Sequence, residues 1–546
     1  MNRNINEILL AREQKQQDIQ MLLERYITVL VLSINYPGPD KCNLYSKFVY
    51  DQASQKVKKL FQVDEEINKE SYAGYYGVFG LKEKSVKAKQ KSIELEDLWE
   101  LGRLIDLDVY DCELGILNRK EFNKENRKCF ICNQEAKICG RNRTHSVDEL
   151  ISFFQHTVNQ YKRSYMGKEN EVMELHRKEK GLLEMQSLFH VKNKEDLAKA
   201  YTPGISAICK AIATNELVAD EETIKGKMVA VISDGSAVLG LGDIGDKASL
   251  PVIEGKSLLY KELANVNAFP ICIKQGTVNE MVQTIYNISD SFAAIHLEDF
   301  KAPECFEIEE KLQNLCDIAV YHDDEHGTAI ALLAAIINAC KLTKRSFNEI
   351  KIVMCGVGAS GLASAKLLYE AGIHNIVLVD KQGIITQNNA ANRYQKDFAK
   401  IVNASNEEGT LSNALKQADI FVGLSDANVL NVEEIKEMND NPIVFALANP
   451  IPEIDPVLAK ENGAYIVGTG SSKYANQINN VLVFPGLFKG LLQRRDIKKV
   501  SNKLKIAVAT ALANLSDELD QNHIIVDVFD ERVVPIIENI VLNFKE

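Results

Sequence analysis

Residues 351–380 read KIVMCGVGASGLASAKLLYEAGIHNIVLVD and contain two apolar runs, a glycine-rich turn and a final acid. The first run, 351–355, has the length and character of a buried parallel strand. The pattern G-x-G-x-x-G follows it, an alanine-rich helical stretch comes next, and Gly372 is placed to end that helix. The second run, 376–379, ends at Asp380. This order predicts a Rossmann-like dinucleotide-binding unit within an α/β protein.

The glycines of this turn have distinct roles in such a unit. Gly356, Gly358 and Gly361 permit a tight turn and a close approach of the backbone to a pyrophosphate. The phosphates would lie at the N-terminus of the helix, which begins with Ala359 and Ser360. The alternative interpretation is a tight glycine turn that binds no nucleotide.

The acid at the end of the second run bears on the choice of nucleotide. Asp380 lies 19 residues beyond Gly361, where a carboxylate can accept hydrogen bonds from a ribose 2′-hydroxyl. This favours NAD over NADP, because a 2′-phosphate would meet a like charge. Lys381 is the opposing feature, since a lysine there would suit a 2′-phosphate.

Length and composition narrow the class of protein. A chain of 546 residues predicts three or four domains. The net charge of −12 argues against binding to nucleic acid, which requires a basic face. The N-terminal segment is polar rather than signal-like, and no apolar run reaches the roughly 20 residues of a membrane helix. Eleven scattered cysteines suit a reducing compartment, so we expect a cytoplasmic protein with no membrane partner.

Acids follow two further apolar runs upstream of the glycine motif. Glu298 and Asp299 come after 292–295, and Asp323 and Asp324 come after 318–320. Acids at the ends of buried parallel strands point into the crevice where α/β proteins bind ligands. Carboxylates without cysteine partners select a hard ion such as Mg²⁺ or Mn²⁺. The alternative is a solvated acidic face, just as Lys256 could be a solvated lysine.

Residues from about 171 to 546 resemble the short bacterial form of malic enzyme. The resemblance rests on several motifs in the family's order: VKNKEDLAKAYTPG (191–204), VLGLGDIG (238–245), PVIEGK (251–256), LEDFKAPECFEIE (297–309), HDDEHGTA (322–329), the glycine motif, ALANP (446–450) and NQINNVLVFPG (476–486). It implies a substrate domain, an NAD-binding domain and metal-dependent decarboxylation of a C4 dicarboxylate, malate or oxaloacetate.

The resemblance also implies a role for individual residues. Three acids would be the metal ligands: Glu298, Asp299 and Asp324. Lys256 would be the general base on the substrate hydroxyl with Asp323 as its ionic partner, and Tyr201 would return a proton to C3. Two asparagines match those beside the substrate carboxylate and the nicotinamide: Asn449 and Asn480. The long eukaryotic form has an arginine where this chain has Val238 and Leu239, so the substrate-carboxylate clamp is not located.

The N-terminal part differs in character, and a charged stretch, 161–180, predicts a linker or an exposed helix after it. Its sharpest feature is Asp106-x-Asp108, which on a strand places two carboxylates on one face, able to hold Mg²⁺ against a triphosphate. A solvated edge strand is the common alternative.

A second cluster has a spacing that suits structural zinc: Cys129, Cys132, Cys139 and His145. The alternative is three reduced thiols beside a basic strip that binds phosphate, which would give the same sequence pattern.

Together these features resemble citrate lyase holo-acyl-carrier-protein synthase. The matching stretches are LLAREQKQQ (9–17), INYPGPDK (34–41), LGRLIDLDV (101–109) and CFICNQEAKICGRNRTHSVDEL (129–150). That family transfers a phosphoribosyl-dephospho-CoA group from its triphosphate form onto the acyl carrier protein of citrate lyase. The resemblance assigns Asp106 and Asp108 to metal and nucleotide, and four residues to phosphates: Arg103, Arg141, Arg143 and His145. Trp99 and Glu100 stand where that family usually has His-Pro, a departure at a position that could contact a phosphate or a base.

The fusion suggests how the two activities relate. The family chemistry of citrate lyase yields oxaloacetate, which a malic-type enzyme could decarboxylate with NAD dispensable. We therefore expect either malate oxidation or oxaloacetate decarboxylation, and a rival reading makes one part a binding module only. The expected domains are 1–165, a mixed α+β transferase, 166–325, a substrate domain, and 326–546, an NAD-binding domain. We also expect a homodimer or a larger homo-oligomer.

Overall fold

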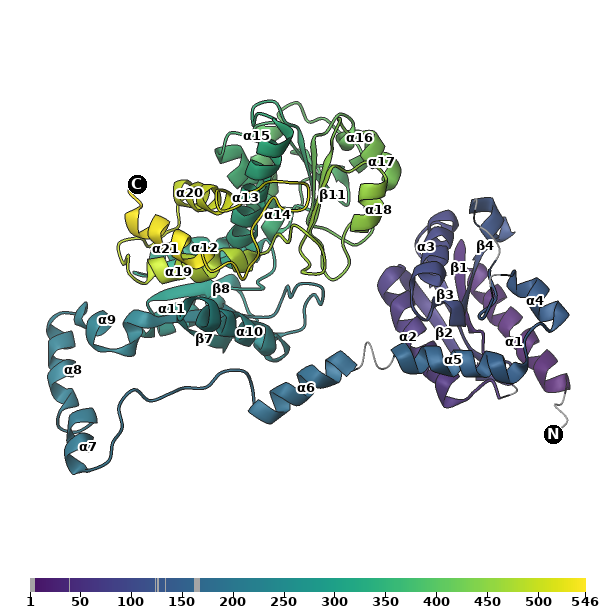
Figure 1. Cartoon of the computed structure of the whole chain (residues 1–546), viewed down its shortest axis with the longest axis horizontal. Helices are drawn as coiled ribbons and strands as arrows, with labels where there is room; N and C mark the ends of the chain where they lie inside the picture. Colours follow the sequence, from purple (N-terminus) through teal and green to yellow (C-terminus); the bar gives the residue numbers. More distant parts are fainter. Residues whose placement is uncertain (1–4, 39, 123, 125–126, 133, 162–166) are drawn as a thin grey trace. The chain divides into compact units, whose positions relative to one another are not determined.

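The computed structural model describes residues 5–38, 40–122, 124, 127–132, 134–161 and 167–546. The chain forms two compact units, Met1–Lys180 and Gly181–Glu546 (Figure 1). The boundary expected between 165 and 166 lies outside the described residues. The charged stretch that follows contains an exposed helix, α6 (Gly167–Glu179), as one of the two sequence interpretations predicted.

The first unit is built on a five-stranded antiparallel sheet in the order β2-β3-β1-β4-β5. Its strands are β1 (Thr28–Ile34), β2 (Val63–Ser71), β3 (Gly74–Leu81), β4 (Ile105–Asp111) and β5 (Gly115–Ile116). Its helices before the linker are α1 (Ile5–Leu23), α2 (Leu44–Leu60), α3 (Ser85–Leu98), α4 (Ala136–Asn142) and α5 (Val147–Tyr161). The predicted mixed α+β fold is confirmed.

Strand β4 shows why the acids of this unit share a face. Its residues alternate between buried and half-buried, so that Ile105 and Leu107 enter the core while Asp106 and Asp108 lie on the opposite side. Period-2 alternation produces this arrangement directly. Trp99 is buried against Tyr161, with ring centroids 6.0 Å apart, so it belongs to the core of this unit.

The second unit contains two parallel sheets. The first has the order β7-β6-β8-β9 and comprises β6 (Met228–Ser233), β7 (Asn267–Cys272), β8 (Ala294–Leu297) and β9 (Ala319–His322). The second has the order β12-β11-β10-β13-β14-β15 and comprises β10 (Ile352–Cys355), β11 (Ile376–Asp380), β12 (Gly383–Ile384), β13 (Ile420–Gly423), β14 (Ile443–Ala446) and β15 (Ile466–Thr469). Only β12 in this second sheet is antiparallel to its neighbour.

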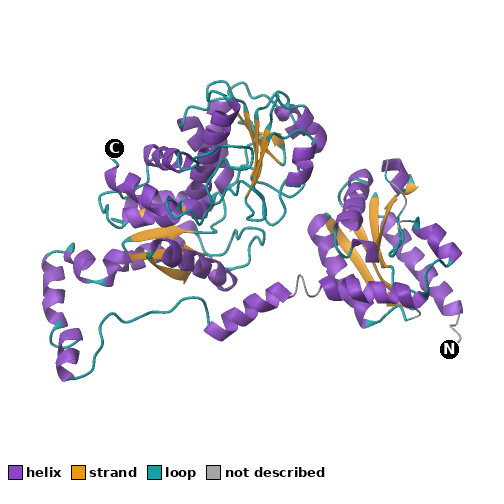
Figure 2. Cartoon of the chain, in the orientation of Figure 1, coloured by secondary structure: helices purple, strands orange, loops and turns teal. Residues whose placement is uncertain are grey.

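Helices cover both faces of the second sheet (Figure 2). Alternate residues of β10 explain this, because Ile352 and Met354 enter one core cluster while Val353 and Cys355 enter another. One layer contains α14 (Ala359–Glu370) and the other contains α16 (Leu411–Leu415), α17 (Val432–Lys436) and α18 (Pro456–Glu461). A strand that is buried on both faces has a continuous run of apolar residues, and the run 351–355 was predicted as a strand for this reason.

The remaining helices surround and join the two sheets. Those near the first sheet are α9 (Val218–Glu222), α10 (Asp246–Ala264), α11 (Val278–Ile288) and α12 (Glu304–Leu315). Helix α19 (Phe484–Leu491) also lies against the first sheet, because Phe488 contacts His296 of β8 and Tyr321 of β9, and α21 (Val533–Asn543) packs on α19. Helix α15 (Arg393–Val402) lies near the second sheet, and α13 (Asp323–Thr343) packs against α20 (Asn502–Ala513). By length and composition α13 is apolar enough to cross a membrane, but 67% of its apolar window is buried within the unit. It contacts α14 and α20 and is a core helix here.

Two helices of this unit, α7 (Lys194–Ala200) and α8 (Ile205–Thr214), bury none of their residues. We call residues 188–214 the arm. The sequence of α8, ISAICKAIAT, is mostly apolar, yet none of its residues is buried and the helix contacts the short α9. Figure 1 shows both helices apart from the strands of the unit. An apolar helix left in water normally marks a surface that associates.

Candidate active sites

Four acids meet where β8 and β9 end. The two strands are parallel with Leu297 opposite His322, so the residues that follow them, Glu298 and Asp323, emerge side by side. Asp299 turns the chain with a left-handed φ of 60°. Asp324 lies in the first turn of α13, and its carboxylate accepts the backbone N–H of Asp299 at 2.7 Å. The structure thus brings these predicted acids close together, and their roles stay a prediction.

Lys256 is inserted among these acids from helix α10. Its Nζ lies 2.5 Å from Oδ2 of Asp323 and 3.1 Å from Oε1 of Glu298, with 11% of the side chain exposed. Burial alone would lower the pKa of this lysine, but the charges of Asp323 and Glu298 outweigh burial and raise it. The ammonium also lies 4.7 Å from the ring centroid of Phe484.

Three of the acids form a group that fits a divalent cation. Oxygens of Glu298, Asp299 and Asp324 lie within 4.8 Å of one another. Oδ2 of Asp299 is buried and has no hydrogen-bond partner among the described residues. Burial, and then the charge of Asp324, raises the pKa of Glu298 to about 8 and that of Asp299 to about 9. An all-oxygen group whose buried acids repel one another in this way suits Mg²⁺ or Mn²⁺.

Two residues behind the acids orient Glu298. His296 Nε2 lies 2.7 Å from Oε2 of Glu298, and its Nδ1 lies 2.8 Å from the hydroxyl of Tyr260. All three are buried. Such hydrogen bonds fix the direction of a ligating carboxylate. Neither His296 nor Tyr260 was predicted from the sequence, although His296 lies on β8 only two residues before Glu298.

The glycine turn has the geometry that a bound dinucleotide requires. Gly356 has a φ of 91°, and a Cβ there would lie 2.3 Å from the backbone oxygen of Leu424. A Cβ on Gly361 would lie 1.9 Å from the oxygen of Gly356, so any side chain would force the turn open. Gly358, by contrast, faces open space at the N-terminus of α14. That free backbone surface is where phosphate oxygens would bind.

Helix α14 begins against the acidic group. Ser360 donates its hydroxyl to the backbone oxygen of Asp324 at 2.6 Å, so the glycine turn and the group of acids contact each other. Asp380 ends β11 as predicted, and its carboxylate accepts the N–H of Lys381. The ammonium of Lys381 lies 3.2 Å from Asp426.

Of the two predicted asparagines, Asn480 lies beside the start of α13. A Cβ added to Gly327 would lie 2.8 Å from Cβ of Asn480 and 2.2 Å from Oδ1 of Asp323, so these groups lie close together. Asn449 is half-buried beside Gly470 and contributes to a small pocket with Thr469 and Tyr474. Tyr201 is not brought to the acids of its own chain, because it lies in the arm with 68% of its surface exposed.

The first unit has a separate polar cleft of about 1200 Å³. Asp106 and Asp108 line it together with basic side chains from four segments: Lys89, Arg103, Arg119, and the adjacent pair Arg127 and Lys128. Arg127 lies 3.0 Å from Oδ1 of Asp106. Burial, and then the charge of Asp106, raises the pKa of Asp108. Paired acids ringed by cations are suited to a metal-bound phosphate chain.

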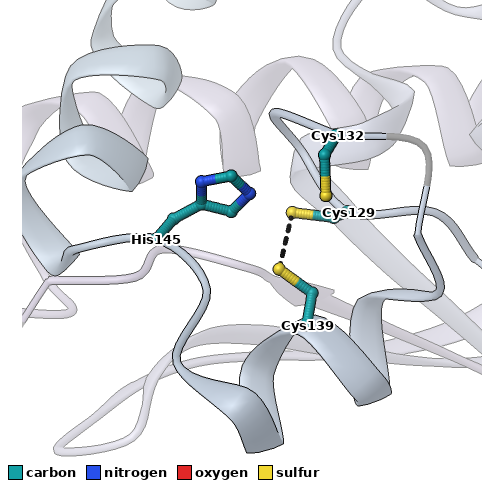
Figure 3. A group of neighbouring side chains, drawn as sticks. All are labelled: Cys129, Cys132, Cys139 and His145. Atoms are coloured by element: carbon teal, nitrogen blue, oxygen red, sulfur yellow. Dashed lines mark hydrogen bonds between the residues drawn. The ribbon is translucent and has the colours of Figure 1, made fainter.

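The other predicted phosphate-binding residues lie elsewhere. Arg141 and Arg143 are exposed and are not among the residues that line the cleft. His145 lies with the three cysteines 129, 132 and 139 (Figure 3). Lys15 was missed by the sequence analysis: it donates to Ser33 at 2.6 Å, opposite Asp106 in the sheet register, and its charge interacts with both acids. Its place in the stretch 9–17 was the available signal.

Comparison with known proteins agrees with the geometry of the second unit. Residues 180–313 match the family "malic enzyme, N-terminal domain", and residues 326–540 match "malic enzyme, NAD binding domain". An NAD-dependent malic enzyme of Geobacillus stearothermophilus is 47% identical over 357 residues, which span 65% of this chain and 74% of that protein. The chain belongs to the malic enzyme family. The bifunctional malic/malolactic enzyme of Bacillus subtilis is 44% identical over 68% of this chain and 91% of its own length.

Solved malic enzymes share the fold of this malic enzyme unit. The NAD-dependent malic enzyme of Thermotoga maritima has a TM-score of 0.66 and 40% identity, covering 68% of this chain and 98% of that one. The malic enzyme of Pyrococcus horikoshii has a TM-score of 0.64 and 40% identity, covering 66% of this chain and 86% of that one. The predicted α/β fold with a substrate sheet and a Rossmann-like NAD domain is therefore confirmed.

The first unit has a different origin. Residues 3–161 match the family "apo-citrate lyase phosphoribosyl-dephospho-CoA transferase". The chain is thus a fusion of this transferase domain with a malic enzyme, as the two resemblances predicted.

Proposed function

We propose that the malic enzyme unit converts malate to pyruvate and CO₂ with NAD and a divalent cation. The observation that carries this is the buried cluster of Lys256, Asp323 and Glu298, joined through Asp324 to the first turn of the nucleotide-binding helix. A proton acceptor, an acidic cation site and a dinucleotide turn are therefore in contact. We keep 166–325 and 326–546 as the two functional domains of this unit, preceded by 1–165.

In this proposal the residues of the chain move protons and hold the substrate. Lys256 takes the proton of the C2 hydroxyl while a hydride passes from C2 to the nicotinamide. The C3–C4 bond then breaks, CO₂ leaves, and Tyr201 gives a proton to C3 to complete pyruvate. Asn449 and Asn480 face the substrate carboxylate and the nicotinamide. A cation held by Glu298, Asp299 and Asp324 would supply positive charge beside the C2 oxygen.

The cation also bears on the protonation of Lys256. A base must lose its proton before it acts, and the raised pKa of this lysine opposes that. The cause of the raised pKa is the charge of Asp323 and Glu298. A divalent ion beside Glu298 would offset that charge and bring the lysine closer to a working base. Metal binding is therefore expected to favour loss of the proton from Lys256.

Decarboxylation of oxaloacetate is the second candidate function. The match of residues 3–161 to a citrate lyase maturation family favours it, because citrate cleavage generates oxaloacetate. The same acids and Tyr201 would serve, with NAD dispensable. Steady-state assays of the whole chain with malate and with oxaloacetate, each with and without NAD, separate the two. Turnover of malate in the presence of NAD supports the first function. Turnover of oxaloacetate without NAD, with no turnover of malate, supports the second.

We propose that the chain acts as a homodimer in which the arm of one copy completes the site of the other. The arm exposes an apolar helix, and Figure 1 shows α7, whose C-cap is Tyr201, apart from α10, which contains Lys256. A twofold exchange of arms would bury α8 and supply the missing proton donor. Eleven free cysteines and relatives from bacteria support a cytoplasmic location for this dimer.

For the first unit we propose transfer of a phosphoribosyl-dephospho-CoA group to the acyl carrier protein of citrate lyase. Asp106 and Asp108 would hold Mg²⁺ against the triphosphate, and Arg103 and the other cations of the cleft would bind its phosphates. Incubation of the chain with apo carrier protein, Mg²⁺ and the triphosphate donor should increase the mass of the carrier protein. No mass gain with a folded first unit would mean that this part has lost its chemistry.

A further inference from the structure

The cysteines of the transferase domain come together from two short elements. Cys129 and Cys132 lie in a tight hairpin in which the N–H of Cys129 donates to the oxygen of Gln134 at 2.8 Å. Cys139 lies on α4, and His145 follows that helix in the turn before α5. Figure 3 shows the imidazole of His145 facing the three thiols. A cysteine hairpin followed by a helix that returns the remaining ligands is a common frame for zinc.

The distances within this cluster suit a metal better than a disulfide. Sγ of Cys129 lies 3.3 Å from Sγ of Cys139, well beyond the length of a disulfide bond. Zinc–sulfur bonds of about 2.3 Å in a tetrahedron place two sulfurs roughly 3.8 Å apart. The four residues all offer ligand atoms within 4.8 Å of one another. The separation of Cys129 and Cys139 therefore differs from that of two zinc-bound sulfurs by only about half an ångström.

The imidazole provides an independent indication. Nε2 of His145 is buried and has no hydrogen-bond partner among the described residues. A buried nitrogen left without a partner costs free energy, so such groups are rare in folded proteins. Cys129 and Cys139 are also buried, each with 5% of its surface exposed. An ion at the centre would use the unpartnered nitrogen and the thiolates at once.

We propose that Cys129, Cys132, Cys139 and His145 bind one Zn²⁺ as a closed structural site. Three thiolates and an imidazole select zinc over Mg²⁺ or Mn²⁺, which prefer oxygen. Four protein ligands complete the tetrahedron, so no position remains for water or substrate. The site therefore stabilises the domain and takes no part in bond making.

The zinc site would fix one wall of the polar cleft. Lys128, Phe130 and Lys137, which alternate with the ligands along the chain, line that cleft. Arg127, two residues before the first ligand, donates to the backbone oxygen of Ile105 at 2.6 Å and pairs with Asp106. Loss of zinc would release this segment and disorder the surroundings of Asp106. This consequence for catalysis rests on the proposed transferase function, whereas zinc binding does not.

The test is the metal content of the whole chain, purified without chelator and measured by mass spectrometry of the elements. We expect about one zinc per chain, lost in Cys139→Ser and kept in Cys112→Ser. Cys112 is the matched control because it is a free, exposed cysteine of the same domain outside the cluster. Both variants should keep malate turnover, since neither residue belongs to the malic enzyme unit. Zinc retained by Cys139→Ser would overturn the proposal.

A second measurement uses the unmodified chain and so does not depend on the folding of a variant. Replacement of zinc by Co²⁺ should give strong visible absorption with thiolate-to-cobalt charge transfer, which a carboxylate site cannot produce. Absence of that absorption, or a Cys129–Cys139 disulfide in the freshly isolated chain, would refute the site. A zinc-loaded chain that fails to modify the carrier protein would refute the transferase and leave the zinc site standing.

Discussion

Lys256 is the residue on which the proposed malate chemistry depends, because it is the one cation that contacts both Asp323 and Glu298 in the described cluster. We expect Lys256→Ala to reduce malate turnover by about 10²–10⁴-fold, the range for loss of a general base. The control is Lys261→Ala, which removes an exposed lysine from the same helix α10. Initial rates with saturating metal and NAD give the comparison. A rate for Lys256→Ala close to that of the control would remove this lysine from the mechanism.

Asp380 carries the prediction about nucleotide choice. Its carboxylate and that of Asp426 would both face a 2′-phosphate, and Lys381 is already paired with Asp426. We therefore expect kcat/KM for NAD to exceed kcat/KM for NADP in the unmodified chain. Asp380→Ser should lower the ratio of these two values, because it removes the repulsion between the carboxylate and the 2′-phosphate. Steady-state kinetics with both nucleotides measure it. A native preference for NADP would contradict the assignment and would make Lys381 the 2′-phosphate contact.

At the scale of elements, a chain of buried polar contacts through Glu309, His326 and Lys505 connects three helices of the malic enzyme unit. Glu309 on α12 bonds to His326 on α13 at 2.9 Å, and His326 lies 3.0 Å from the ammonium of Lys505 on α20. Lys505→Met should lower the free energy of unfolding by roughly 1–3 kcal/mol, because it removes the contact with buried His326 and a positive charge that stabilises the buried carboxylate of Glu309. Lys503→Met, an exposed change on the same helix, is the control. Equal denaturation midpoints for both variants would show that Lys505 does not stabilise the buried carboxylate of Glu309.

Local pattern predicted the elements that carry their own signals. The strands of the NAD sheet are apolar on both faces, and the acids after β8 and β9 follow directly from runs that the sequence shows. What local pattern could not predict was which distant residues meet. Lys15 approaches Asp106 and Asp108 only because α1 packs near β1. Such meetings depend on packing between elements, which no short motif encodes. The grouping of His145 with the three cysteines, by contrast, was predicted from their spacing in the sequence.

At the scale of the whole molecule, the linker between the two units permits a test of their independence. Each unit has its own hydrophobic core, and the family matches end at 161 and begin again at 180. Residues 1–161 and 181–546, expressed separately, should therefore each fold with a cooperative transition. Calorimetry of the two fragments measures this. A fragment that melts without cooperativity would show that the units stabilise each other.

The proposed exchange of arms leads to a prediction that only the assembled molecule can meet. Tyr201→Phe and Lys256→Ala should each be nearly inactive, since one lacks the proton donor and the other the base. Mixed under conditions that exchange subunits, they should recover about a quarter of the unmodified activity, because half of the dimers are hybrids with one intact site of two. Malate turnover before and after mixing measures the recovery. If Tyr201 served the site of its own chain, every site in the mixture would lack one group and activity would not return.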